Sequence, residues 1–118
     1  MSQVNFYEIP AKNPKKILKF YSQVFDWKME DWGKDYWGIN SGRGKNEGIK
    51  GAIYLSEKMK TVVNTIGVPD MQEYIDRIKK YGGKVMGKPH NMGEWGWHVY
   101  FKDPEGTMLG ISGPMKKN

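Results

Sequence analysis

The chain has 118 residues, a net charge of +6 and no cysteine, and 38% of its residues are hydrophobic. This length suits one ordinary domain with a core, and the lack of cysteine excludes disulfides, thiolate catalysis and cysteine metal sites. No apolar run approaches the roughly 20 residues that span a bilayer, and the N-terminus lacks the charged-then-apolar order of a signal peptide. We therefore expect a cytoplasmic protein without a membrane partner.

The positive charge comes almost entirely from scattered lysines. Arg43 and Arg77 are the only arginines among the 19 basic residues. Arginine is the usual reader of phosphates and base edges, and no dense basic run is present. We therefore expect a lysine-rich, solvated surface and no nucleic-acid partner.

The first half of the chain predicts a strand, a helix and a hairpin. "VNFYEI" (4–9) is rich in aromatic and β-branched residues, as strands are. Asn13 and Pro14 suit the cap and first position of a helix that runs towards Phe25. "WKMED" (27–31) leads into a loop, and "DYWGIN" (35–40) and "IKGAIYLS" (49–56) are strands joined by the polar segment "SGRGKNEG" (41–48). The helix carries one apolar stripe, made of Ile17, Leu18, Tyr21, Val24 and Phe25.

The second half repeats that order. "TVVNTIGV" (61–68) is a strand, and "PDMQEYIDRIKKYGG" (69–83) is a helix with Asp70 as N-cap, Glu73 at the capping-box position and a glycine pair as its stop. Its apolar stripe is Met71, Tyr74, Ile75 and Ile78. Strands follow at 84–89, 97–101 and 107–112, with a loop at 90–96 that holds His90. The segment "DPEG" (103–106) predicts a type I turn between the last two strands.

Two similar β-α-β-β-β modules therefore fill the chain, at about 4–56 and 61–113. Leu18 and Ile75 have the same separation as Tyr21 and Ile78, which indicates an internal repeat. We expect one α+β domain over 1–118, in which the two modules form a curved mixed sheet with a cleft and the helices lie outside.

Three segments carry a resemblance to a known family: "EIPAKNPKKILKFYSQVFDWK", "VPDMQEYIDRIKKYGGKV" and "GWHVYFKDPEGTMLGI". Together they resemble the vicinal oxygen chelate superfamily, which contains glyoxalase I, bleomycin-resistance proteins and extradiol dioxygenases. The resemblance covers roughly residues 4 to 113. It is specific for the fold and unspecific for function, because this fold hosts several chemistries.

Metal-dependent members of this family hold a divalent ion with His or Glu at four equivalent strand positions. The resemblance places these positions at Phe6 (or Val4), near Ala52, at Val63 and at Gly110. Divalent ions need several N or O donors, so the resemblance implies no metal and no other cofactor at this site. Only His90 and His98 are histidines, and a non-standard site from Glu8, Asn64 and His98 remains an alternative.

The lining of the expected cleft decides the function. Alternation places Phe6 and Glu8 on one face of the first strand, and His98 and Tyr100 on one face of the strand 97–101, opposite the apolar set Trp97, Val99 and Phe101. Trp32, Trp37 and Trp95 lie in or beside loops, where large aromatic residues serve as ligand platforms or as packing at a rim or dimer contact. Gly110 would deepen the cleft by leaving out a side chain.

We predict two functions from these residues. The first is metal-independent binding of a small, neutral or anionic aromatic molecule, with Phe6, Trp37, Asn64, Trp95, Tyr100 and Gly110 as the ligand-binding residues. A sequestrant of cationic drugs is disfavoured by the positive charge of the chain. The alternative is a lyase or isomerase related to lactoylglutathione lyase, with Glu8 and His98 as catalytic residues or with a non-standard metal site.

The last expectation concerns assembly. Members of the family usually form homodimers, and Trp32, Trp37 and Trp95 add more aromatic surface in loops than a monomer commonly exposes. A symmetric homodimer that buries these rings is expected, with the walls of the cleft shared between the two copies.

Overall fold

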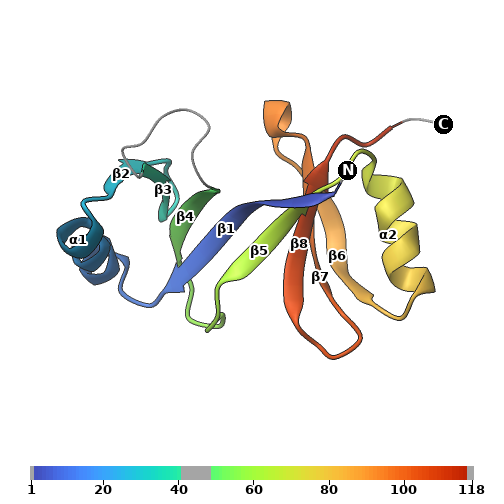
Figure 1. Cartoon of the computed structure of the whole chain (residues 1–118), viewed down its shortest axis with the longest axis horizontal. Coiled ribbons are helices and arrows are strands. Elements are labelled where there is room, and N and C mark those ends of the chain that lie inside the picture. Colours follow the sequence, from blue (N-terminus) through green and yellow to red (C-terminus); the bar gives the residue numbers. More distant parts are fainter. Residues whose placement is uncertain (1, 41–48, 117–118) are drawn as a thin grey trace. The chain divides into compact units, whose positions relative to one another are not determined.

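The computed structural model describes residues 2–40 and 49–116, so the connection "SGRGKNEG" lies outside the described residues. The elements in chain order are β1 (Gln3–Ala11), α1 (Pro14–Phe25), β2 (Lys28–Asp31), β3 (Tyr36–Asn40), β4 (Lys50–Leu55), β5 (Val63–Gly67), α2 (Met71–Lys80), β6 (Lys84–Asn91), the 3-10 turn η1 (Gly93–Trp95), β7 (Trp97–Lys102) and β8 (Met108–Gly113) (Figure 1). The expected α+β class is confirmed, and each half contains one helix and four strands. Among the described residues no helix is long and apolar enough to cross a membrane.

The chain divides into two compact units, and each is described here by itself. We call Phe6–Val62 the N-terminal unit, and Val63–Asn118 together with Met1–Asn5 the C-terminal unit. The first residues of β1 thus group with the second half of the chain, whereas the sequence assigns the whole first strand to the first module.

In the C-terminal unit the strand order is β5-β8-β7-β6. β5 and β8 are parallel, and the hairpins β7–β8 and β6–β7 are antiparallel. Met71 and Ile75 of α2 form a buried core with residues of the sheet, namely Val68, Val99, Phe101 and Ile111. The predicted apolar stripe of this helix and the predicted core strand 97–101 are confirmed.

Local chemistry sets the ends of α2. The Asp70 carboxylate accepts a hydrogen bond from the backbone N–H of Gln72 at 3.3 Å, as an N-cap does. Glu73 forms an ion pair with Arg77 at 2.6 Å, one helical turn further on, instead of the expected capping box. Gly82 ends the helix with φ +96°, a conformation that glycine adopts without steric cost.

The strands β6, β7 and β8 and the turn at 103–106 form as the sequence predicts, but the predicted end of β6 is wrong. The Asp103 carboxylate accepts hydrogen bonds from the N–H groups of Glu105 and Thr107, and Gly106 has φ +89°. β6 extends to Asn91, beyond the predicted end at residue 89. His90 therefore lies in a strand, level with His98 of β7, and not in the expected loop.

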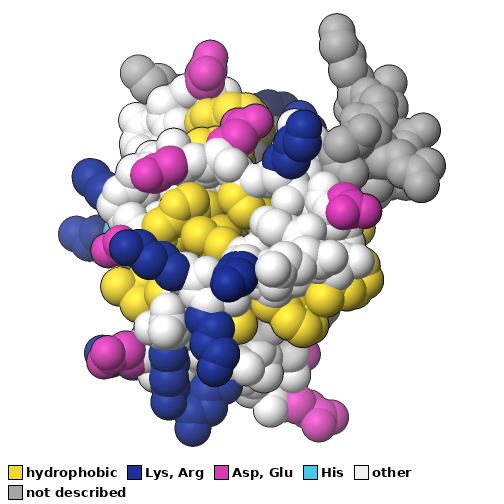
Figure 2. All heavy atoms as spheres, turned by 90° about the vertical axis from the view of Figure 1, so that its left-hand side faces the viewer, with side chains coloured by type: hydrophobic (Ala, Val, Ile, Leu, Met, Phe, Trp, Pro, Cys, Tyr) yellow, Lys and Arg dark blue, Asp and Glu magenta, His cyan; other side chains and the backbone are white. Residues whose placement is uncertain are grey.

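The N-terminal unit has the strand order β2-β3-β4-β1, with β1 parallel to β4. β2 is a strand that the sequence did not predict, because four residues of mixed polarity carry too little periodicity. The N-cap of α1 is confirmed, since the Asn13 side chain accepts from the Lys16 N–H at 3.3 Å. No residue of this helix is buried, and Phe20, Val24 and Phe25 are each more than half exposed. Figure 2 shows hydrophobic surface among lysine side chains on this side of the molecule.

Candidate functional site

The C-terminal unit has a polar sheet face opposite α2. Thr65, Gly110 and Tyr100 lie level across β5, β8 and β7, as do Gly67, Ser112 and His98. Successive side chains of a strand point to opposite faces, and Val99, Phe101 and Ile111 between these residues belong to the core under α2. His98 Nε2 lies 3.4 Å from Thr65 Oγ1, and the His98 and Tyr100 rings meet edge to face at 4.6 Å. The predicted residues His98, Tyr100 and Gly110 thus do share a face.

Gly110 on this face has a steric reason. A Cβ at this position would lie 2.6 Å from Nε2 of His98 and 3.0 Å from Oγ1 of Thr65. The imidazole therefore occupies the space that a side chain at position 110 would need. The expectation that this glycine deepens a cleft is wrong, because the ring of His98 fills the space.

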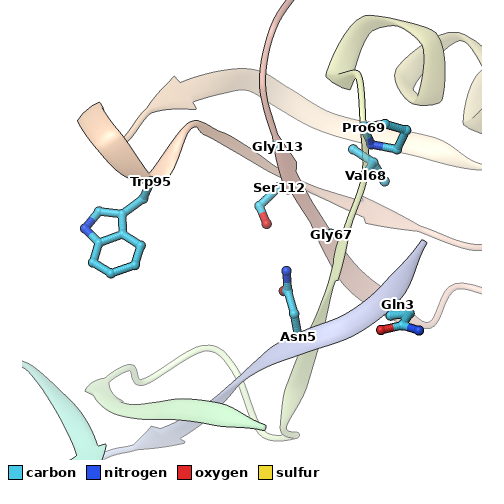
Figure 3. A pocket seen from close by; sticks show the side chains of 8 residues that line it. All are labelled: Gln3, Asn5, Gly67, Val68, Pro69, Trp95, Ser112 and Gly113. Carbon is cyan, nitrogen blue, oxygen red and sulfur yellow. The ribbon is translucent and has the colours of Figure 1, made fainter. Parts of the chain in front are cut away.

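An open cavity of about 420 Å³ lies at the end of the same face. Its lining comes from both ends of the C-terminal unit: Gln3, Asn5, Gly67, Val68, Pro69, Trp95, Ser112 and Gly113. Figure 3 shows the Trp95 indole on one side and Val68 with Pro69 on the other, while the side chains of Asn5 and Ser112 project towards each other between them. The Trp95 side chain is highly exposed, at 73%. The cavity therefore combines aromatic and apolar walls with the hydrogen-bonding side chains of Gln3, Asn5 and Ser112.

Two glycines shape the cavity. A Cβ on Gly67 would lie 2.4 Å from the Nδ2 atom of Asn5, so the amide of Asn5 lies directly over β5. Gly96 follows η1 with φ +84° and accepts a hydrogen bond from the N–H of Met92, which closes the turn that carries Trp95. Gly67 thus leaves room for the Asn5 amide, and the turn at Gly96 places Trp95 at the rim of the cavity.

In the N-terminal unit one carboxylate is buried. Glu8 is 6% exposed, and its Oε2 accepts a hydrogen bond of 2.7 Å from the hydroxyl of Tyr36. The ring of Tyr36 lies between those of Trp32 and Tyr54, with centroids 5.8 and 6.0 Å away. Burial is the main cause that raises the pKa of Tyr54, and the charge of Glu8 raises it further. A hydrogen bond with Ser56 lowers this pKa and so partly offsets the two effects. This cluster keeps a carboxylate beside a row of aromatic rings.

The remaining predicted ligand-binding residues lie in different places. Phe6 is half-buried and shares a strand face with Glu8. Trp37 lies level with the buried Ile53, on the opposite face of the sheet from Glu8. Asn64 is exposed and alternates with Thr65, so it lies on the α2 side of its sheet, away from His98.

Comparisons with known proteins agree with this architecture. Residues 3–111 match the model of the glyoxalase/bleomycin resistance protein/dioxygenase superfamily, and the chain belongs to this superfamily. No curated protein sequence matches the chain. A superfamily member from Vibrio splendidus 12B01 is similar in structure, with 10% identity, a TM-score of 0.67, and 96% of this chain and 99% of that one covered.

Two enzymes share the fold as well. Methylmalonyl-CoA epimerase from Mycobacterium tuberculosis has 8% identity and a TM-score of 0.69, with 96% of this chain and 88% of that one covered. An extradiol ring-cleaving dioxygenase from B. fuscum has 10% identity and a TM-score of 0.71, with 97% of this chain but 33% of that one covered. At these identities the likeness concerns the fold alone.

The residues at the superfamily's metal positions do not fit a divalent ion. The register places Glu8 level with Ala52, and Thr65 level with Gly110. Glu8 and Thr65 are thus the residues level with two of the predicted positions, Ala52 and Gly110. Alanine and glycine offer no side-chain donor, and the described residues include no group of three or more His, Asp or Glu side chains that could hold a metal.

Sequence reasoning missed most residues of these sites, among them Asn5, Tyr36, Thr65 and Ser112. Thr65 was one residue from the predicted Asn64, and an exact register would have found it. Tyr36 lies in the predicted strand 35–40, but nothing local connects it with Glu8, 28 positions away. Asn5 and Ser112 come from strands at opposite ends of the chain, and no motif joins them.

Proposed function

We propose that this protein binds a small aromatic molecule without a resident metal. The cavity beside Trp95 carries the proposal, since a highly exposed indole next to hydrogen-bonding side chains is typical of ligand sites. No charged side chain is among the residues that line the described cavity. This lining favours a neutral ligand over an anionic one, because an anion needs a cation or several N–H donors as partners.

Tryptophan fluorescence tests this proposal. Neutral and anionic aromatic compounds are titrated into the wild type, Trp95→Phe and the matched control Trp32→Phe, which replaces an exposed tryptophan of the other unit. We expect saturable quenching in the wild type and the control, and a loss of most of this signal in Trp95→Phe. A silent titration across the whole set of compounds, or equal quenching in all three proteins, would contradict the proposal.

The buried Glu8 favours a second candidate function, a lyase or isomerase with Glu8 as a proton-transfer group. A carboxylate that is 6% exposed and accepts a 2.7 Å hydrogen bond is held in one orientation, as a general base must be. Exchange of an acidic C–H next to a carbonyl for deuterium tests this candidate. We expect Glu8→Gln to abolish such exchange, whereas the absence of exchange in the wild type would exclude it.

Elemental analysis of protein purified without chelators tests the metal-free part of both candidates. We expect less than a tenth of an equivalent of nickel, zinc, iron or manganese per chain. One tightly bound ion per chain would instead support a non-standard metal site. It would contradict the inference that the residues at the four predicted strand positions leave the chain without a metal.

We also propose that the protein is a homodimer. Trp32 and Trp95 are 53% and 73% exposed, although Trp37 is half-buried in β3. The apolar residues on α1 add to this exposed surface, and surfaces of this kind commonly mark protein contacts. Light scattering should give about twice the 13.6 kDa chain mass at micromolar concentration. A monomer mass would exclude the dimer.

A further inference from the structure

The chemistry of the cavity in the C-terminal unit specifies more than an aromatic ligand. We infer that this cavity takes an uncharged planar ring with a lactam-type edge, in which a ring N–H and a C=O are neighbours, as in uracil, thymine and guanine. The inference rests on the proposed function, because it names the class of ligand for that site.

The edge of the ring is specified by Asn5 and Ser112. An asparagine amide presents one acceptor and two donors side by side, and a hydroxyl both donates and accepts. Within residues 2–40 and 49–116 neither side chain has an assigned hydrogen bond to the protein, and both project into the cavity (Figure 3). A lactam edge matches the paired donor and acceptor of the amide, whereas a plain hydrocarbon ring offers neither side chain a hydrogen bond.

The Asn5 amide lies over β5 at the edge of the cavity. It lies against Gly67, where a Cβ would approach Nδ2 to 2.4 Å. Ser112 lies level with Gly67 on the neighbouring parallel strand. The two hydrogen-bonding groups therefore come from β1 and β8, the strands on either side of β5. Two groups that the sheet places at a set spacing favour a specific edge over a general polar contact.

The faces of the ring are specified by the cavity walls. The indole of Trp95 lies on one side and Val68 with Pro69 on the other, so the walls on both sides offer apolar surface to a flat ring. The other amide of the lining, Gln3, comes from the same strand as Asn5. A sugar, with hydroxyls around its whole circumference, would find partners at one edge only. The volume of about 420 Å³ lies in the usual range for small-ligand sites, roughly 300–1,000 Å³.

Calorimetric titration with matched compounds tests the inference. The compounds are uracil, 1,3-dimethyluracil (the same ring without its N–H groups), phenol, benzoate and glucose. We expect uracil to bind at least ten-fold more tightly than 1,3-dimethyluracil or phenol. Asn5→Leu and Ser112→Ala should each reduce the uracil affinity at least five-fold and leave the phenol affinity within two-fold, and Trp32→Phe serves as the unchanged control.

Gly67→Ala provides a second variant that keeps every lining side chain. The added methyl meets only the mobile end of Asn5 within 3 Å, so the chain should fold as before while the amide is displaced. We expect the same loss of preference for uracil as in Asn5→Leu, at an unchanged thermal midpoint. Full retention of the preference would contradict the role of Asn5.

The outcomes separate the inference from the proposal on which it rests. Equal binding of uracil, 1,3-dimethyluracil and phenol would overturn the lactam edge and leave an aromatic-binding protein. Tighter binding of benzoate or glucose than of uracil would also overturn it. Failure of every ring compound to bind would overturn both the inference and the proposed function.

Discussion

The two units contain the same succession of strands and helix, but their helices are packed differently. Met71 and Ile75 of α2 are 0% and 5% exposed, whereas no residue of α1 is buried. Instead, aromatic rings of α1 pack along the helix and against Trp27, with Tyr21 and Trp27 stacked at 5.2 Å. The same pattern of hydrophobic residues therefore predicts a helix in both units, but only α2 buries its apolar side chains.

The difference in packing suggests different roles for the two units, one in stability and one in contacts with other chains. The C-terminal unit has a well-packed core under α2 and a polar face with a cavity on its other side. The N-terminal unit keeps exposed apolar side chains on its helix and a buried carboxylate in its sheet. We expect the C-terminal unit to account for most of the stability of the described chain. We expect the N-terminal unit to offer the surface that a second copy of the chain contacts.

The largest test of the comparison removes one side chain from each helix. Met71→Ala should lower the free energy of unfolding by about 3 kcal/mol, since it leaves a cavity in a close-packed core. Phe20→Ala, at a side chain that is 51% exposed, should cost about 0.5 kcal/mol or less. Denaturant titration of both variants and of the wild type measures these losses of unfolding free energy. Similar losses would mean that the two helices are packed alike.

A second test addresses the buried acid of the N-terminal unit. Tyr36→Phe removes the hydroxyl that donates to Glu8 at 2.7 Å, and we expect a loss of about 1.5 kcal/mol in unfolding free energy, because hydrogen bonds to charged groups are strong. Tyr81→Phe, at an exposed side chain, is the matched control and should be neutral. A neutral Tyr36→Phe would show that this hydrogen bond contributes little.

The polar face of the C-terminal unit is tested by an added methyl group. Gly110→Ala brings a Cβ to 2.6 Å from His98 and 3.0 Å from Thr65, so we expect a loss of about 1 kcal/mol and a changed NMR signal of the His98 imidazole. Gly67→Ala meets the free end of one exposed amide and should cost less. An unchanged His98 signal in Gly110→Ala would contradict the close contact.

The smallest expected effect depends on pH. Burial first, and then the charge of Glu8, raises the pKa of Tyr54 in the folded chain above its usual value of 10.0. The folded state therefore binds this proton more tightly than the unfolded state. The contribution of Tyr54 to the free energy of unfolding is fully present below pH 10 and is lost as the pH rises through the pKa of the folded state. Tyr54→Phe should make the alkaline loss of stability shallower. A parallel decline in both proteins would assign the loss to other groups, such as Tyr7, whose pKa burial also raises.

The sequence could predict what depends on local signals. Asp70 and Asn13 cap their helices as expected, and the turn at Asp103 forms as its residue types indicate. Partners that depend on register could not be predicted, because a shift of one residue in a strand exchanges its two faces. Thus Thr65 lies beside His98 where Asn64 was expected, and Trp37 lies on the opposite face from Glu8.

The parallel pairing of β5 with β8 has a consequence for how the C-terminal unit folds. Thr65 and Gly110 stand near the two ends of this unit in sequence, and they can pair only after the intervening chain has formed a closed loop. Closing long loops costs entropy before any contact is gained, so non-local pairing slows folding. The hairpin of β7 and β8, closed by the turn at Asp103, needs no such loop. We expect this hairpin to form first and the addition of β5 to set the folding rate, so the cavity that Gly67 helps to build is completed late.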